Sequence, residues 1–129
     1  MRNRPLNLDA FGISRWAYRE MLAFCRQYDD FRREADRLLH ERSNGRRFDP
    51  TPETAARRET LLSYTRTIEQ AAHVAGGGGW EYAIIENCCR GVRLDCLDGS
   101  RMPTANRNSY YKARREFFFL LHRKRRANQ

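Results

Sequence analysis

The chain is poor in lysine, has no long hydrophobic run and contains no paired cysteine motif. Only two of its 25 basic residues are lysines, and the other basic residues are arginines. Its apolar runs are far shorter than the roughly 20 residues that a helix needs to cross a bilayer, and no hydrophobic signal segment stands near the start of the sequence. These absences argue against a membrane or secreted protein, and we expect a cytoplasmic location.

The cysteines lack the spacing of the usual zinc sites. Cys88 and Cys89 are adjacent, Cys96 follows seven positions after Cys89, and Cys25 is distant in sequence. Zinc ligands normally come in pairs separated by two to four residues. We therefore expect buried, reduced thiols, and we predict neither a metal nor a cofactor.

Groupings of residues that would support catalysis are also missing. His40, His73 and His122 fall on three separate predicted helices, without a neighbouring Ser/Asp pair or a metal-ligand spacing. Asp95 and Asp98 stand near a predicted helix end, where turn and capping roles are common. The sequence therefore predicts a non-enzymatic protein.

The C-terminal segment, residues 101–129, is rich in basic residues and nearly free of acidic ones. Residues 101–129 hold nine Lys/Arg and a single acid, Glu116, so they carry +8 of the net charge of +9. Aromatic residues interrupt this basic segment at Tyr110, Tyr111 and 117–119. A helix that packs one face and offers cations on the other has this composition, and it suits nucleic-acid phosphates.

Helical periodicity dominates the rest of the chain, and the sequence predicts an all-α fold. Ser14 is a candidate cap for a helix that runs to about residue 42. Its apolar positions recur at spacings of four and three, and Trp16, Leu22, Cys25 and Leu39 widen that stripe. After a polar loop, Thr51 and Pro52 begin a second helix that extends to about residue 75.

These two helices predict an antiparallel hairpin over residues 13–75, preceded by a loose leader, residues 1–12. The hairpin either forms part of the core or makes a homodimer or partner interface. Gly76–Gly79 follow it. They lack the lysine and the preceding strand of a phosphate-binding loop, so we expect a flexible hinge there.

The segment after the glycines has the order of a helix-turn-helix unit, residues 80–129. A helix is expected over 80–90, ended by Gly91, then a short helix near Leu94. After Pro103 a long helix is expected over about 104–126, with Phe117 on its inward stripe and Phe118 beside that stripe.

Duplex DNA is the expected partner. Residues at the beginning of the last helix would read bases, and the other cations would bind phosphates. The predicted base-reading residues are Asn106, Arg107, Asn108, Tyr111 and Lys112. The predicted phosphate-binding residues are Arg101, Arg114, Arg115, Arg123, Lys124, Arg125 and Arg126.

The run from Tyr110 to Leu121, followed by Arg123-Lys124-Arg125, resembles the C-terminal signature of small sigma-factor-like transcriptional regulators encoded by phages and prophages, the ArpU and RinA type. Pro103 matches the proline that leads their recognition helix, and residues 82–91 fit the preceding helical stretch. The resemblance covers about residues 80–126. It implies a fold like region 4 of sigma factors, binding to promoter-like duplex DNA, and a bacterial host cell.

Two other functions remain open. The chain could be the DNA-recognition subunit of a packaging machine, similar to phage small terminases. It could also be a phage protein that binds and modulates host RNA polymerase or another host nucleic-acid enzyme through the helical hairpin.

Overall fold

The computed structural model of the protein describes residues 11–40 and 51–127, and all the elements in these ranges are helices or helical turns. The all-α prediction is therefore confirmed for the described residues. The predicted polar loop at 41–50 and most of the predicted leader, residues 1–10, lie outside them.

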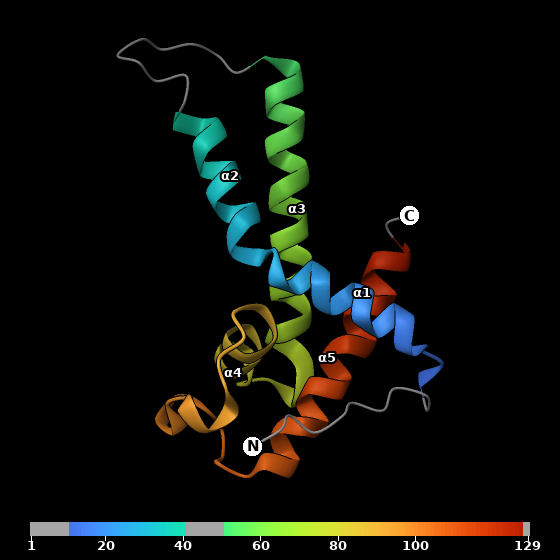
Figure 1. Ribbon diagram of the computed structural model, residues 1–129, viewed down its shortest axis with the longest axis vertical. Helices are drawn as coiled ribbons and strands as arrows, with labels where there is room; N and C mark the ends of the chain where they lie inside the picture. The colour runs from blue at the N-terminus through green and yellow to red at the C-terminus, as the bar shows by residue number, and fades with distance from the viewer. Residues whose placement is uncertain (1–10, 41–50, 128–129) are drawn as a thin grey trace.

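An arm of two helices rises from a body in which the other helices surround the lower half of α3 (Figure 1). Two helices, α2 and α3, form the arm, and α1, α4 and α5 belong to the body. The elements in chain order are α1 (Arg15–Arg26), α2 (Tyr28–His40), α3 (Pro52–Val74), the 3-10 turn η2 (Ala75–Gly77), α4 (Glu81–Ile84), the π-helical turn η3 (Ile85–Cys89), the 3-10 turns η4 (Leu94–Cys96) and η5 (Gly99–Arg101), and α5 (Arg107–Ala127).

Both predicted N-terminal caps are present. The Ala17 N–H donates to Ser14 Oγ at 3.1 Å, at the beginning of α1. The Thr54 N–H donates to Thr51 Oγ1 at 3.2 Å, and Pro52 occupies the first turn of α3. Each cap satisfies a backbone donor that has no partner within its helix.

The single helix predicted from residue 14 to 42 is wrong, because the chain bends at Gln27 into α1 and α2. Here α1 packs on η3 and α5, whereas α2 packs on α3. No proline or glycine marks the bend in the sequence. The helix breaks where its packing partner changes. Tertiary contacts therefore decide the break, although the unbroken apolar stripe predicts one continuous helix.

Two arginines tie this bend to the π-helical turn. Arg26 Nε donates to the Cys88 carbonyl oxygen at 3.0 Å. Arg90 reaches both carboxylate oxygens of Asp29, at 3.0 and 3.1 Å, and its hydrogen bonds hold the pKa of Asp29 below its usual range. A bidentate pair of this kind fixes orientation as well as distance.

The C-terminal elements differ in detail from their prediction. The helix expected over 80–90 is a short α4 that continues as the π-helical turn, and Gly91 ends it with a φ of +70°. The last helix begins at Arg107 rather than near 104. Asn106 Oδ1 accepts from the Asn108 N–H at 2.9 Å, and this cap sets the later beginning.

One hydrophobic core joins residues from both sides of the glycine stretch. Met21 and Ile68, which precede it, share a cluster with Ile84, Phe117 and Phe118, which follow it. Phe117 and Phe118 are fully buried, as a core role for these rings requires. The division into a hairpin and a C-terminal unit stays a prediction, and the core crosses the expected boundary.

The apolar stripe predicted for the first helix of the hairpin includes side chains that the structure leaves exposed. Trp16 is 68% exposed and Leu39 is 53% exposed, whereas Cys25 is fully buried. Once the chain bends at Gln27, the outer edges of the stripe turn toward solvent.

Gly76 lies where the chain turns tightly against α5. Its φ is +64°, and a β-carbon at this position would stand 2.6 Å from the Ala113 Cβ and 2.8 Å from the Trp80 ring. The next glycine, Gly77, has a φ of +85° and nothing within 4 Å of such an atom. Gly76 is therefore required both for its backbone conformation and for the close approach of α5.

We expect Gly76→Ala to lower the free energy of unfolding more than Gly77→Ala. Both substitutions strain the left-handed backbone by about 1–2 kcal/mol. Gly76→Ala adds a clash with Ala113 and Trp80, and such overpacking costs about 1–3 kcal/mol. Urea unfolding of the two variants measures the difference. An equal loss of unfolding free energy in the two variants would mean that the close approach of α5 to Gly76 does not restrict the residue at this position.

Candidate nucleic-acid interface

One face of α5 is buried along most of the helix. Tyr110, Ala113, Phe117 and Leu121 are at most 1% exposed, and they recur every three or four residues. This face contacts α1, α3, α4 and η2. The rotation of α5 about its own axis is therefore fixed by packing.

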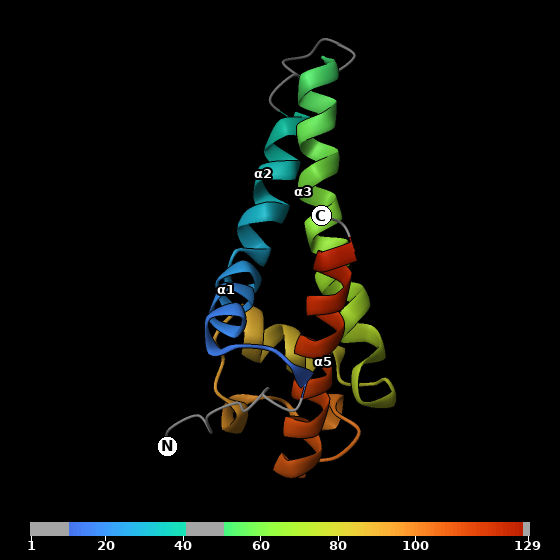
Figure 2. The ribbon, with the colours of Figure 1, turned by 90° about the vertical axis from the view of Figure 1, so that its right-hand side faces the viewer.

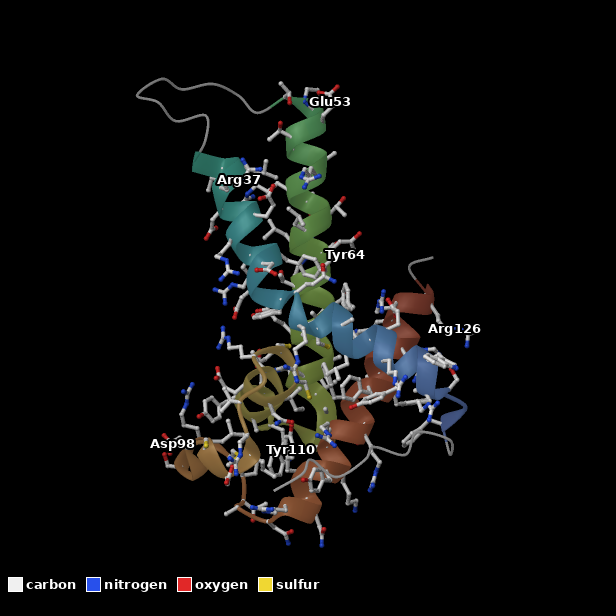
Figure 3. The ribbon with its side chains drawn as sticks, in the orientation of Figure 1. Arg37, Glu53, Tyr64, Asp98, Tyr110 and Arg126 are labelled. Carbon is white, nitrogen blue, oxygen red and sulfur yellow. The ribbon has the colours of Figure 1, made fainter. Side chains whose placement is uncertain are left out.

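The opposite face carries a row of polar and basic side chains, which we call the α5 stripe. Its members recur at spacings of three and four, so they lie on one side of the helix. The stripe consists of Asn108, Lys112, Arg115, Phe119, Arg123 and Arg126. Arg126 projects from the C-terminal part of α5 (Figure 3).

The cations of the stripe are not neutralised within the described part of the chain. Among the residues of 11–40 and 51–127, no carboxylate lies within ion-pair distance of Lys112, Arg115, Arg123 or Arg126. Glu116 is the only acid of α5. The stripe is therefore a line of positive charge that faces outward.

An open groove of 740 Å³ runs beside the N-terminal half of the stripe. Thr104, Ser109, Lys112 and Arg115 contribute polar groups to its lining, Glu116 contributes a carboxylate, and Trp80 and Phe119 contribute rings. Phe11 also lines the groove, with its ring centroid 5.1 Å from that of Phe119. The groove combines hydrogen-bonding, cationic and aromatic surface, which is a composition that nucleic acid can engage.

The structure divides the predicted phosphate-binding residues into two groups. Arg115, Arg123 and Arg126 belong to the stripe. Arg114 does not, because it is only 6% exposed and its guanidinium lies over the Tyr111 ring at 4.9 Å. We therefore remove Arg114 from the candidate interface.

Three further predicted phosphate-binding residues also lie off the stripe. Arg125 pairs with both oxygens of Glu20, at 2.5 and 2.7 Å, and stacks over Phe24. Lys124 borders a small pocket beside α3 that Glu69 and Glu81 also line. Arg101 lies 3.9 Å above the centre of the Tyr82 ring, in the connection before α5.

The predicted base-reading residues are all near the beginning of α5, but they are not equivalent. Arg107, Asn108 and Lys112 are exposed. The Asn106 side chain caps the helix, and Tyr111 is half-buried between its ring contact with Tyr110 and the guanidinium of Arg114. Geometry thus favours Arg107, Asn108 and Lys112 as the residues that could reach base edges.

Sequence reasoning missed a buried polar cluster that holds α5 against the π-helical turn. The Tyr110 hydroxyl donates to Asn87 Oδ1 at 2.6 Å, and Arg114 Nη1 donates to the same oxygen at 3.4 Å. Asn87 Nδ2 in turn donates to the Val92 carbonyl oxygen at 2.8 Å. Burial raises the pKa of Tyr110, so its hydroxyl stays protonated and acts as a donor. The available signal in the sequence was the position of Asn87 on the apolar face of the predicted helix, together with Ile84 and Cys88.

The cysteines are free thiols, and their surroundings differ. Cys25, Cys88 and Cys89 are buried, whereas Cys96 is exposed. Burial raises the pKa of Cys88 to about 12, and the Cys89 thiol together with burial holds the pKa of Cys25 well above its usual value. Within residues 11–40 and 51–127, no three His, Cys, Asp or Glu side chains are grouped so that they could hold a metal ion.

Comparison with known proteins returned no match to a family model, to a curated protein or to a solved structure. In the described part of the chain, no helix has both the length and the apolar character needed to span a bilayer.

We expect Tyr110→Phe to lower the free energy of unfolding by about 1–2 kcal/mol. The substitution keeps the ring but removes the hydroxyl that donates to Asn87 in the core, and a lost buried hydrogen bond costs about this much. Tyr64→Phe is the matched control, because Tyr64 is 39% exposed on α3. Thermal or urea unfolding compares the two variants, and equal stability would show that the Asn87 cluster contributes little.

Thiol labelling of the native protein at neutral pH should modify Cys96 alone at an appreciable rate. The thiolate is the reactive form. All three buried thiols have poor access, and the pKa values of Cys25 and Cys88 are also raised. Mass spectrometry after brief exposure to N-ethylmaleimide measures the sites. Cys96→Ser should abolish rapid labelling, whereas rapid modification of Cys25 or Cys88 would mean that the core opens readily.

Proposed function

We propose that this protein is a DNA-binding regulator of transcription, of the kind that phages and prophages encode, and that it reads duplex DNA with α5. The observation that carries this proposal is the α5 stripe: a helix anchored by its aromatic face presents an outward row of cations without acidic partners among the described residues. The resemblance of residues 80–126 to phage sigma-like regulators supports the same function.

The beginning of α5 is the part that we propose enters the major groove. It lies at the lower edge of the molecule, beyond the end of α3 (Figure 1). The major groove of B-DNA is about 12 Å wide and admits an α-helix. Arg107, Asn108 and Lys112 would then face base edges, and Arg115, Arg123 and Arg126 would lie toward phosphates.

In this proposal α4 and η3 act as the supporting helix of a helix-turn-helix unit, and α5 as its recognition helix. The connection between them, residues 90–106, is longer than a tight turn and contains η4 and η5. It is held to the supporting helix, because the Asp98 N–H donates to the Tyr82 hydroxyl at 3.0 Å. The connection is thus a packed part of the unit.

A second candidate function is favoured by a different surface. A groove of 820 Å³ lies where α1, α2, α3 and the end of α5 meet, and Phe24, Phe31 and Tyr64 lie among its lining residues. Their ring centroids are 5.1–5.6 Å apart. Partly exposed aromatic surface of this kind is common at protein interfaces, so binding to a host nucleic-acid enzyme is the alternative.

Duplex DNA binding should fall steeply with salt, and Lys112→Ala/Arg115→Ala should weaken it. With four or five phosphate contacts, the slope of log K against log salt should be about −4, or about −0.9 per contact. Because Lys112 is placed at base edges and Arg115 toward a phosphate, removing both should make that slope shallower by about 1. Fluorescence anisotropy with labelled duplex DNA measures both quantities.

The control for this experiment is Arg33→Ala/Arg37→Ala, which removes the same charge from α2. Arg37 lies on the arm, far from Arg126 at the end of α5 (Figure 3), and Arg33 is four residues before it on the same helix. This variant should bind DNA almost as the unmodified protein does. A flat salt response, or equal losses in both double variants, would contradict DNA binding by α5.

A further inference from the structure

The first turns of α1 expose a tryptophan between two arginines. Trp16 is 68% exposed, and the guanidinium carbons of Arg15 and Arg19 lie 5.5 and 5.0 Å from its ring centre. Among the described residues, neither arginine forms an ion pair with a carboxylate. We call these three residues the α1 patch.

The α1 patch combines an exposed aromatic ring with two cations. The two guanidiniums lie against the indole ring with the modest energy of exposed cation–π contacts. The indole N–H can only donate, so in a complex it offers a hydrogen bond to an acceptor of the partner. The α1 patch therefore fits a partner that offers negative charge, hydrogen-bond acceptors and some apolar surface.

The helix that carries the α1 patch packs beside the helix that carries the α5 stripe. Figure 2 shows α1 and α5 side by side on the face turned toward the viewer, with residues 11–14 leading from α1 to α5. The contacts agree, because Phe11 packs on Phe119 and the Arg123 guanidinium lies 5.5 Å from the centre of the same ring. A line of aromatic and cationic side chains thus runs from the α5 stripe toward α1.

Packing keeps the two surfaces in a fixed relation. Tyr18 on α1 stacks edge-on against Phe118 on α5, with ring centroids 5.0 Å apart. Glu20 receives both hydrogen bonds from Arg125. Because α1 is held to α5 by these core and ion-pair contacts, the α1 patch cannot move independently of the stripe.

We propose that the DNA interface extends onto α1, where Arg15, Trp16 and Arg19 contact the sugar-phosphate backbone beside the segment that α5 reads. This inference rests on the proposed function of α5. Guanidiniums and the indole N–H donate to phosphate oxygens, and the indole face packs on deoxyribose. The α1 patch then fixes the orientation of α5 on the duplex, and it contributes affinity without sequence preference.

The location of the two tryptophans provides a direct test. Trp16 is exposed and Trp80 is only 4% exposed, so acrylamide should quench Trp16 in the free protein. Acrylamide is neutral, so DNA does not repel it. Saturating duplex DNA should protect this fluorescence from quenching. Trp16→Phe should remove both the quenching and the protection.

Affinity provides the second measurement. Arg15→Ala/Arg19→Ala should weaken binding to duplexes of different sequence by the same factor, about tenfold, and should make the salt slope shallower by about 2. Arg33→Ala/Arg37→Ala removes the same charge at the same spacing and should change little.

The outcomes separate this inference from the proposed function. If the unmodified protein binds no duplex DNA, DNA binding by α5 is wrong. A different outcome overturns only the role of α1. In that case DNA binding still depends on Lys112 and Arg115, but DNA does not protect Trp16 from quenching. In addition, Arg15→Ala/Arg19→Ala binds DNA with the same affinity as Arg33→Ala/Arg37→Ala. The α1 patch would then be assigned to a protein partner.

Discussion

Burial of the aromatic face of α5 is the constraint on which the rest of this structure depends. Tyr110, Phe117 and Leu121 are withdrawn almost completely from solvent, and burying such side chains contributes about 1.5–3 kcal/mol each. A helix held in this way cannot rotate. The side chains on its other face, including Lys112 and Arg115, are therefore oriented outward by packing.

The core that holds α5 also joins distant parts of the chain. Met21 from α1 and Ile68 from α3 pack in the same cluster as Phe118. At Gly76, the absence of a side chain allows the end of α3 to approach α5 closely. The candidate interface therefore depends on residues throughout the chain, although its charge is concentrated at one end.

Arginine serves two different purposes in this protein. Arg26, Arg90 and Arg125 donate hydrogen bonds that tie helices together, and Arg114 is buried beside Asn87. The rigid, planar guanidinium suits such bidentate and stacked contacts better than an ammonium group does. A count of basic residues overestimates the positive surface of this protein, because part of the charge stabilises the fold.

The sequence by itself determined the helical class, the caps at Ser14 and Thr51, and the inward stripe of α5, because each depends on residues within a few positions of one another. Only the tertiary structure decided the bend at Gln27, the burial of Arg114 and the exposure of Trp16. Each depends on which helix packs against which, and a periodic pattern does not carry that information. The same limit applies to the candidate interface: the sequence located its charge, and packing selected which cations face outward.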